Sequence, residues 1–306
     1  MNVALDAAPP SVQLSPLPAE FDLDFYLTEN DDLIARDLNS AHSHFTHHGR
    51  SEGRAGTSYC YRNSFLSLLD PSHDTLEIGP FCSPCVRGPR VRYFDVLGRD
   101  ALIERANTLH YSYSDPPEID YVSSVGDLGI VTEPFAQVVS SHCVEHQPDL
   151  VRHLQAVERI LAPGGRYFLI VPDKRFCFDH FIPTSSIADV VGAYCDKRVR
   201  HAAADVLEHE SMTTHNDQVR HWLGDHGEPF WAQPGGVDRL RRTMQTFEAS
   251  RNGYIDTHAW QFTPESFKSL INDLALLDLT RLTASRVYNT PRLSVEFCAV
   301  LEKGSD

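Results

Sequence analysis

The chain has 306 residues, of which 42% are hydrophobic, which suits one large domain or one domain with a small accessory piece. Its formal net charge of -15 disfavours duplex DNA or RNA as the main partner, because phosphate binding requires clustered Lys and Arg. No run of about 18 apolar residues is present, so we expect no membrane span. The seven cysteines are expected to be reduced thiols in a cytoplasmic protein.

The first part of the chain predicts a flexible tail followed by a small helical module. Residues 1–20 are rich in Pro and Ala and lack the basic start and apolar core of a signal peptide. In residues 21–58, apolar side chains between Phe25 and Phe45 recur at roughly helical spacing, and the glycines of "HHGRSEGR" end the pattern. So short a segment cannot hold a core alone, and we expect it to serve docking or assembly.

Residues 74–172 alternate between strand and helix patterns. Short strands are expected at "TLEI", "RVRYFDV", "EIDYV", "PFAQVVSS" and "RYFLIVP". One helix is expected to begin at "DALIERA". A second is expected at "DLVRHLQAVERILA" and to end at the "PGG". Alternating strands and helices predict an α/β fold, with a parallel sheet and helices on both faces.

The last part of the chain predicts a cap and two closing strands. Residues 173–258 are rich in His, Arg and acidic residues and are expected to form a helical cap. The pattern "TPESFKSLINDLALL" is typical of a helix, with Thr263 as its N-cap and Pro264 in its first turn. The strands "LTRLTASRVY" and "LSVEFCAVLEK" follow, with a turn near Asn289–Pro291, and predict an antiparallel end to the sheet.

The segment "DTLEIGPFCSPC" joins the first strand to a loop and suggests several kinds of site. A phosphate loop needs a lysine, but Gly79 is followed by Pro80 and Phe81 and then by no lysine. A dinucleotide loop is disfavoured because the G-x-G-x-x-G pattern is missing. Cys82 and Cys85 could act in thiol redox chemistry, but neither an aromatic approach strand nor a second cysteine pair accompanies them. We favour two structural thiols.

A cofactor loop of another kind is the remaining interpretation. Glu77 precedes Gly79 at the end of the first strand, and Asp95 ends the second strand. Adjacent parallel strands bring both acids to the carboxyl edge of the sheet, where open α/β sheets bind ligands. Asp95 can accept hydrogen bonds from two ribose hydroxyls, and Gly79 lets the backbone approach a ligand closely.

These motifs resemble those of the class I S-adenosylmethionine-dependent methyltransferases. "LEIGPF" is similar to their first motif, and "YFDV" to their ribose-binding acid. "FAQVVSSHCVEHQPDLVRHLQAVERILAPGGRYFLIVPD" is similar, in order, to their strand, "EH" turn, helix, "L-x-PGG" and next strand. The resemblance covers about Leu76 to Pro172 and, more loosely, the strands up to Leu301. It implies a Rossmann-like, mostly parallel sheet with an antiparallel final strand, S-adenosyl-L-methionine as cofactor, and a methyltransferase domain over residues 59–303.

The resemblance also implies the cofactor-binding residues. The acid and glycine of the first motif would lie by the methionine portion, Asp95 would hold the ribose, and Asp127 would approach the adenine. The chain departs from the family at Pro80 and Phe81, where many members carry further glycines. The residues implied in this way are Glu77, Gly79, Pro80, Phe81, Asp95, Asp127, Ser141 and His142.

Two further segments resemble proteins of bacterial polysaccharide assembly. "VPDKRFCFDHFIPTSSIADVV" is similar to a subgroup of these methyltransferases encoded among polysaccharide glycosyltransferases. "FYLTENDDLIARDLNSAHSHFTHHGRSEGRAG" is similar to a helical module attached to glycosyltransferase-related proteins. The likeness implies O-methylation of a sugar hydroxyl on a glycan or nucleotide-sugar, with glycosyltransferases of the same pathway as partners. Another acceptor (a small metabolite, lipid or protein side chain), a non-catalytic scaffold and a nicotinamide oxidoreductase stay open as alternatives.

A sugar hydroxyl is a poor nucleophile at neutral pH, so its methylation needs alignment together with a base or a metal. His146, His209 and His215 are candidate bases, although a single His is more often structural. Asp173 is the candidate orienting or metal-binding acid. A divalent metal held by His209, His215 and Asp217 is not favoured, because their spacing matches no tight ligand signature.

Four residues are candidates for binding the acceptor. Lys174 and Arg175 can pair with an acidic sugar or a phosphate, although "DKRFCFD" can equally be a solvated turn. His258 and Trp260, in "HAWQF", can stack on a sugar face or belong to the core.

Overall fold

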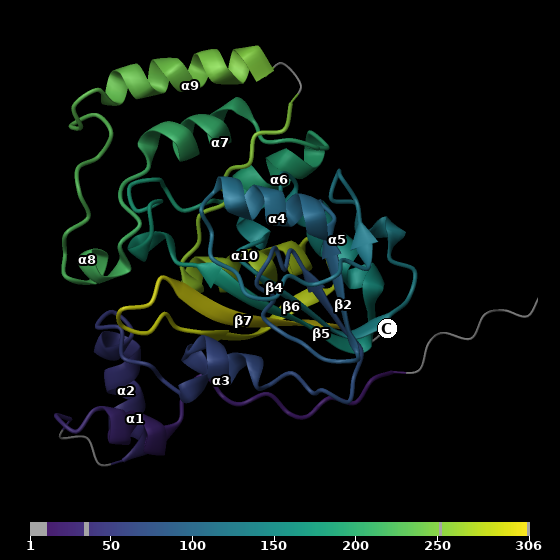
Figure 1. Ribbon diagram of the computed structural model, residues 1–306. Helices are drawn as coiled ribbons and strands as arrows, with labels where there is room; N and C mark the ends of the chain where they lie inside the picture. The colour runs from purple at the N-terminus through teal and green to yellow at the C-terminus, as the bar shows by residue number, and fades with distance from the viewer. Residues whose placement is uncertain (1–10, 34–36, 251–252, 305–306) are drawn as a thin grey trace, which may run out of the picture.

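One seven-stranded sheet flanked by helices organises the protein (Figure 1). The computed structural model describes residues 11–33, 37–250 and 253–304. The strand order is β3-β2-β1-β4-β5-β7-β6, and neighbouring strands are parallel except where β7 pairs with β5 and β6. This confirms the expected α/β, Rossmann-like sheet with an antiparallel final strand. The strands are β1 (Thr75–Ile78), β2 (Val91–Asp95), β3 (Tyr121–Val122), β4 (Phe135–Ser141), β5 (Leu161–Pro172), β6 (Leu282–Tyr288) and β7 (Glu296–Lys303).

Apolar side chains on both faces of the sheet need cover, as in other parallel sheets. Successive strand residues point to opposite faces, so Val138 and Val139 of β4 belong to two different cores. The core that holds Val138 is packed by α5, α6 and α10, and the core that holds Val139 by α3. The α-helices of the described residues are α1 (Leu23–Glu29), α2 (Leu38–His44), α3 (Arg62–Leu66), α4 (Arg99–Thr108), α5 (Leu150–Ile160), α6 (Ile187–Cys195), α7 (Ala203–Leu207), α8 (Gln218–Trp222), α9 (Gly236–Ser250) and α10 (Pro264–Leu276).

Several boundaries differ from the predicted ones, and others agree closely. The helix predicted to reach the "PGG" ends at Ile160, because Leu161 already pairs with Phe135 of β4. The third strand is shorter than predicted, since only its last two residues pair with the end of β2. By contrast, α10 begins with Thr263 as N-cap, whose side chain accepts a hydrogen bond from the backbone N–H of Ser266.

The helical module before residue 58 forms a small cluster of its own. Helices α1 and α2 and the π-turn η1 (Phe45–Gly49) enclose Tyr26, Ala41 and Phe45. The backbone N–H of Arg292, between β6 and β7, donates to the carbonyl of Gly53 over 2.7 Å. In Figure 1 this module lies below the sheet, whereas α7 and α9 lie above it.

Part of the predicted N-terminal tail contacts the sheet. Residues 1–10 lie outside the described residues. The backbone N–H of Val12 donates to the carbonyl of Pro163 (2.8 Å), and Arg166 donates to the carbonyl of Ser15 (2.6 Å). These bonds join the segment to β5.

The cap leaves the sheet directly after β5 and returns directly before α10. Asp173 forms a parallel bridge with Phe262, and the backbone N–H of Lys174 donates to the carbonyl of Phe262 over 2.9 Å. Both ends of the cap therefore meet at the carboxyl end of β5. Figure 1 shows α9 as the outermost helix of the cap, with α7 beneath it.

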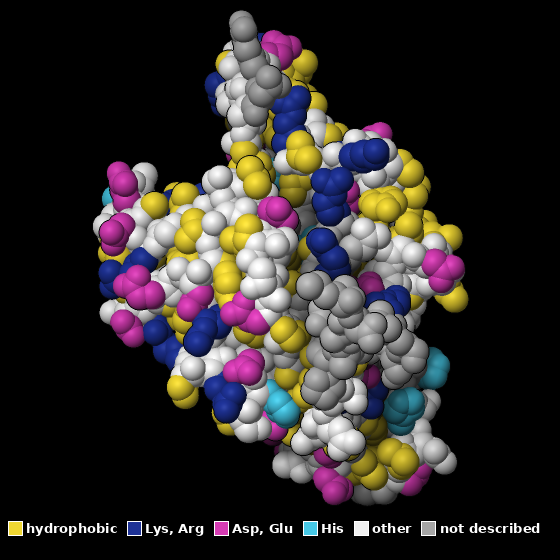
Figure 2. Space-filling view, turned by 90° about the vertical axis from the view of Figure 1, so that its right-hand side faces the viewer, with side chains coloured by type: hydrophobic (Ala, Val, Ile, Leu, Met, Phe, Trp, Pro, Cys, Tyr) yellow, Lys and Arg dark blue, Asp and Glu magenta, His cyan; other side chains and the backbone are white. Residues whose placement is uncertain are grey.

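The surface drawn in Figure 2 has Lys and Arg side chains interspersed with Asp and Glu side chains. No broad area of this face carries one sign of charge, despite the net charge of -15. Within the described part of the chain, none of the helices combines the length and hydropathy that crossing a membrane requires.

Candidate functional site

The loop after β1 is organised by a buried carboxylate. Glu77 accepts hydrogen bonds from the backbone N–H groups of Cys85 (2.7 Å) and Val86 (3.1 Å). Burial raises the pKa of Glu77 to about 7, against the opposing effect of these two donors. Gly79 has a φ of +70°, a conformation that favours glycine, and its N–H donates to the carbonyl of Phe94 in β2.

The two thiols of this loop are poorly suited to redox catalysis. Burial raises the pKa of Cys82 and raises that of Cys85 to about 12, whereas a reactive thiol needs a lowered pKa. All seven cysteines of the chain are free. The structure therefore supports the interpretation of Cys82 and Cys85 as structural thiols.

Asp95 lies beside the first-motif loop at the carboxyl edge of the sheet. Its Oδ1 accepts from the backbone N–H groups of Val96 (2.7 Å) and Leu97 (3.3 Å), and its Oδ2 accepts from Phe81 (3.3 Å). The side chain is largely buried, which raises its pKa. Asp127 is exposed further along the same edge, where it caps a 3-10 turn by accepting from the N–H of Gly129.

Ser141 ends β4, and His142 follows it with a φ of +50°. The Nε2 atom of His142 lies 2.8 Å from Oε2 of Glu296, which also pairs with Arg62. Burial alone would raise the pKa of Glu296, but the hydrogen bonds from His142 and Arg62 lower it to about 2. A carboxylate of β7 thus orients the histidine that follows β4.

Glu145, in the "EH" turn η4 (Val144–His146), is the most unusual group of this edge. Its side chain is fully buried, and neither carboxylate oxygen has a hydrogen-bond partner. Instead, Oε1 lies 3.9 Å from each of three ring nitrogens, namely His142 Nδ1, His146 Nε2 and His258 Nε2. Sequence reasoning assigned this glutamate no role, and its only signal was the acid beside the histidine of the turn.

Two further carboxylates hold the other nitrogens of these rings. Nδ1 of His258 lies 2.6 Å from Oδ2 of Asp179, and Nδ1 of His146 lies 3.0 Å from Oδ1 of Asp256. An ionised carboxylate can only accept, so each Nδ1 donates to its acid and each Nε2 is left facing Glu145. Both acids were missed at the sequence level, because Asp179 and Asp256 stand far apart in the cap sequence.

His209 and His215, both predicted as candidate bases, belong to different clusters. Nδ1 of His209 accepts from the backbone N–H of His258 over 3.1 Å, and burial lowers the pKa of His209 to about 4. His215 stacks on His221 instead, and Asp217 caps α8 by accepting from the N–H of Arg220. The metal group considered for His209, His215 and Asp217 is therefore not assembled as such.

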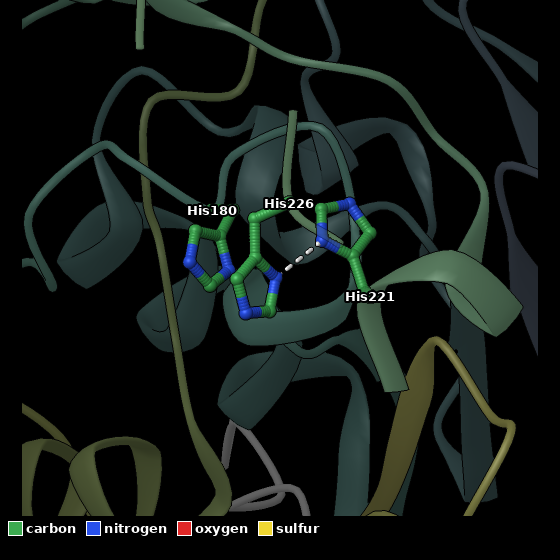
Figure 3. A group of neighbouring side chains, drawn as sticks. All are labelled: His180, His221 and His226. Carbon is green, nitrogen blue, oxygen red and sulfur yellow. Dashed lines mark hydrogen bonds between the residues drawn. The ribbon is translucent and has the colours of Figure 1, made fainter. Parts of the chain in front are cut away.

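A second histidine cluster lies in the cap (Figure 3). The rings of His180 and His226 are stacked, with centroids 3.7 Å apart, and Nδ1 of His226 lies 3.0 Å from Nδ1 of His221. Burial lowers the pKa of His180 and His226 and lowers that of His221 to about 4, which favours neutral rings. One ligand atom from each of these three rings lies within 4.8 Å of the other two, and the hydrogen bond between His221 and His226 uses Nδ1 of both rings.

The remaining predicted residues are held by internal contacts. Both carboxylate oxygens of the buried Asp173 are used, since Arg175 and Thr290 donate to them. Nζ of Lys174 donates to a backbone carbonyl over 2.7 Å, and burial lowers its pKa. Trp260 is buried in the main core and donates its indole N–H to the carbonyl of Gln147. Acceptor binding by Lys174, Arg175, His258 and Trp260 stays a prediction.

Comparison with known proteins finds distant likenesses in structure. A SAM-dependent methyltransferase from Aquifex aeolicus is 9% identical, with 88% of this chain and 100% of that chain covered and a TM-score of 0.37. A protein described as an S-adenosylmethionine-dependent methyltransferase from Listeria monocytogenes is 11% identical, with coverage of 80% and 98% and a TM-score of 0.41. The chain covers 51% of the CurJ carbon methyltransferase structure, with 78% of its own residues, 16% identity and a TM-score of 0.33.

No protein-family profile matches the chain, and no curated protein is similar to it in sequence. TM-scores at this level are too low to assign an activity.

Proposed function

We propose that the protein is an S-adenosyl-L-methionine-dependent methyltransferase. The observation that carries this proposal is the position of Asp95 beside the loop after β1, where the N–H of Phe81 lies 3.3 Å from Oδ2 of Asp95. Asp95, which is suited to hold a ribose, therefore lies at the same sheet edge as the loop at Gly79, which a ligand can approach closely. The order of the motifs along the chain, and the antiparallel β7, support the same proposal.

The residues present fit this cofactor. Among the described residues, Oδ2 of Asp95 accepts a single long hydrogen bond, so it retains capacity to accept from ribose hydroxyls. Within the part of the chain that the structure describes, a Cβ added to Gly79 would meet only Cys143, at 3.5 Å or more, so the space where a side chain would point is open to a close ligand. The chemistry that the cofactor supplies when bound is a methyl group on a sulfonium, which a nucleophile attacks in line. The protein must align that nucleophile.

We further propose a sugar hydroxyl of a glycan or nucleotide-sugar as the acceptor, in surface polysaccharide biosynthesis in the cytoplasm. Support comes from the resemblance of residues 25–56 and 171–191 to proteins of that setting. A hydroxyl needs help to lose its proton. Glu145, His146 and His258 provide that help at the cofactor edge, either as general bases or as ligands of a metal.

The test of the cofactor is calorimetric titration with S-adenosylhomocysteine. We expect micromolar binding by the wild type, at least a tenfold loss in Asp95→Ala, and no loss in Asp100→Ala, whose carboxylate is fully exposed at the start of α4. Absence of binding by the wild type would contradict the methyltransferase proposal and favour a non-catalytic scaffold protein. Binding of NADH in its place would indicate an oxidoreductase.

The acceptor is tested by mass spectrometry of methyl transfer. Nucleotide-sugars and glycan fragments are compared with small metabolites as acceptors, each with the wild type and with Asp95→Ala. Product formed only from non-sugar acceptors would contradict the sugar assignment and leave the methyltransferase proposal standing.

A further inference from the structure

We propose that Glu145, His146 and His258 form a binding site for one divalent transition-metal ion. The first observation is the state of Glu145, which is fully buried with no hydrogen-bond partner for either oxygen. An isolated buried carboxylate is costly and is normally paired or bound to a metal. The structure offers this carboxylate three histidine nitrogens and no hydrogen-bond donor from elsewhere among the described residues.

The second observation is the orientation of the two histidines. Asp179 holds Nδ1 of His258, and Asp256 holds Nδ1 of His146. Metal-binding histidines typically donate their other ring N–H to a carboxylate, which fixes the tautomer and the direction of the free lone pair. Both Nε2 atoms lie 3.9 Å from the same Oε1 of Glu145. Two cap acids therefore aim two histidines at one buried oxygen.

The spacing suits a single ion. The three ligand atoms all lie within 4.8 Å of one another. Bonds from a metal to histidine nitrogen or carboxylate oxygen are about 2.1 Å long. The two separations of 3.9 Å exceed by about 0.5 Å the spacing of two ligands bound at this length to a tetrahedral ion, so a small approach of the side chains brings them onto one ion. The two imidazoles and one carboxylate favour zinc, manganese or iron over magnesium or calcium, which prefer oxygen ligands.

Neighbouring groups extend the site. Nδ1 of His142 lies 3.9 Å from the same oxygen of Glu145, and its Nε2 is held by Glu296. On the other side of His258, Asp179 and His209 complete a second group of ligand atoms within 4.8 Å. These groups are further candidate ligands next to the site, and the three proposed ligands alone leave coordination positions for an external oxygen.

The use of the ion rests on the proposed function, but its binding does not. A hydroxyl bound to a divalent metal loses its proton more readily, which would supply the activation that a sugar acceptor needs. Metal binding is measured without cofactor or acceptor. A wild type that binds S-adenosylhomocysteine but no metal would overturn this inference alone. A wild type that binds the metal but no S-adenosylhomocysteine would overturn the methyltransferase proposal alone.

The experiment is titration of the full chain, freed of metal by chelation, with Zn²⁺ and with Mn²⁺. Bound metal is counted by elemental analysis. We expect about one ion per chain for the wild type and at least a 100-fold weaker affinity for Glu145→Gln and for His258→Gln. The control is His48→Gln, an exposed histidine outside every such group of ligand atoms among the described residues, which should bind as the wild type does. His226→Gln tests the stacked cluster of Figure 3, whose ligand atoms also lie within 4.8 Å of one another, and should leave the binding of this ion unchanged.

Thermal unfolding provides a second readout. Zn²⁺ should raise the Tm of the wild type, because a ligand bound only to the folded state stabilises it. Glu145→Gln should show no such rise. If this variant fails to fold, the partly exposed His146 allows the same test in His146→Gln. A wild type that binds no ion, or a loss confined to His226→Gln, overturns the proposal.

Discussion

Oε1 of Glu77 accepts a 2.7 Å hydrogen bond from the backbone N–H of Cys85. The bond ties the last part of the loop after β1 back to the strand from which the loop begins. Glu77, the acid of the first motif, therefore holds the loop in place. We expect it to influence cofactor binding indirectly, by positioning the backbone near Gly79. Because Glu77 is buried, this bond makes the loop sensitive to the protonation of one carboxyl group.

Glu77→Gln should change how stability depends on pH. Burial raises the pKa of Glu77 from 4.5 to about 7 on folding, so folding favours the protonated form. Its contribution to stability is fully present below pH 4.5 and is lost as the pH rises through 7. We expect this loss, on the order of 3 kcal/mol since one pKa unit is worth about 1.4 kcal/mol, in the wild type and not in the variant.

The measurement is urea unfolding between pH 4.5 and 7.5. Glu118→Gln, at a strongly exposed position, serves as the control and should follow the wild type. Parallel curves for the wild type and Glu77→Gln would contradict the assignment.

His153→Gln should reduce the loss of stability in acid. His153 is buried against Tyr167, whose hydroxyl lies 3.1 Å from its Nε2, and burial lowers its pKa from 6.5 to about 4. Folding therefore favours the neutral ring, and the stability present above pH 6.5 is lost as the pH falls through 4. The wild type should lose more stability than the variant between these values, as followed by thermal unfolding. Equal losses in His153→Gln and in the exposed control His48→Gln would contradict this role.

Thr263→Ala should destabilise α10 by about 1 kcal/mol, the usual cost of removing an N-cap side chain. The Thr263 hydroxyl accepts from the N–H of Ser266, and α10 buries Phe267, Leu270 and Leu274 in the main core. Thr263→Ser keeps the hydroxyl and should unfold within a few tenths of a kcal/mol of the wild type. The check is chemical unfolding of both variants, and equal destabilisation by the two would show that the methyl group matters more than the cap.

The sheet could be predicted from the sequence because its signals are local. The apolar run of β4, the N-cap Thr263 and the acid at the end of β2 each act over a few residues. The end of α5 could not be placed as well, because it is set by pairing between Leu161 and Phe135 of another strand. Local propensity cannot contain that contact.

Part of the candidate site could be predicted from the sequence and part could not. Gly79 directly follows β1 and Asp95 ends β2, so strand order alone brings them to one edge. Glu145, Asp179 and His258 meet only because the cap folds back over that edge, and no spacing in the sequence indicates their contact. The cap is also rich in His and Asp, which can act either as general bases or as metal ligands, so the sequence alone could not distinguish these two roles.

Gly79→Ala should weaken both folding and cofactor binding, and Gly192→Ala is its matched control. A Cβ finds no atom closer than 3.5 Å at Gly79 and none within 4 Å at Gly192, so neither alanine is crowded. Only Gly79 has a positive φ, +70°, which costs a residue with a Cβ about 1–2 kcal/mol. Gly192 lies within α6, where alanine should stabilise the helix by about 0.5–1 kcal/mol. Chemical unfolding should therefore show a lower stability for Gly79→Ala and a higher stability for Gly192→Ala than for the wild type. Titration with S-adenosylhomocysteine should show weaker binding only for Gly79→Ala. Unchanged binding in Gly79→Ala would mean that the loop after β1 does not hold the ligand.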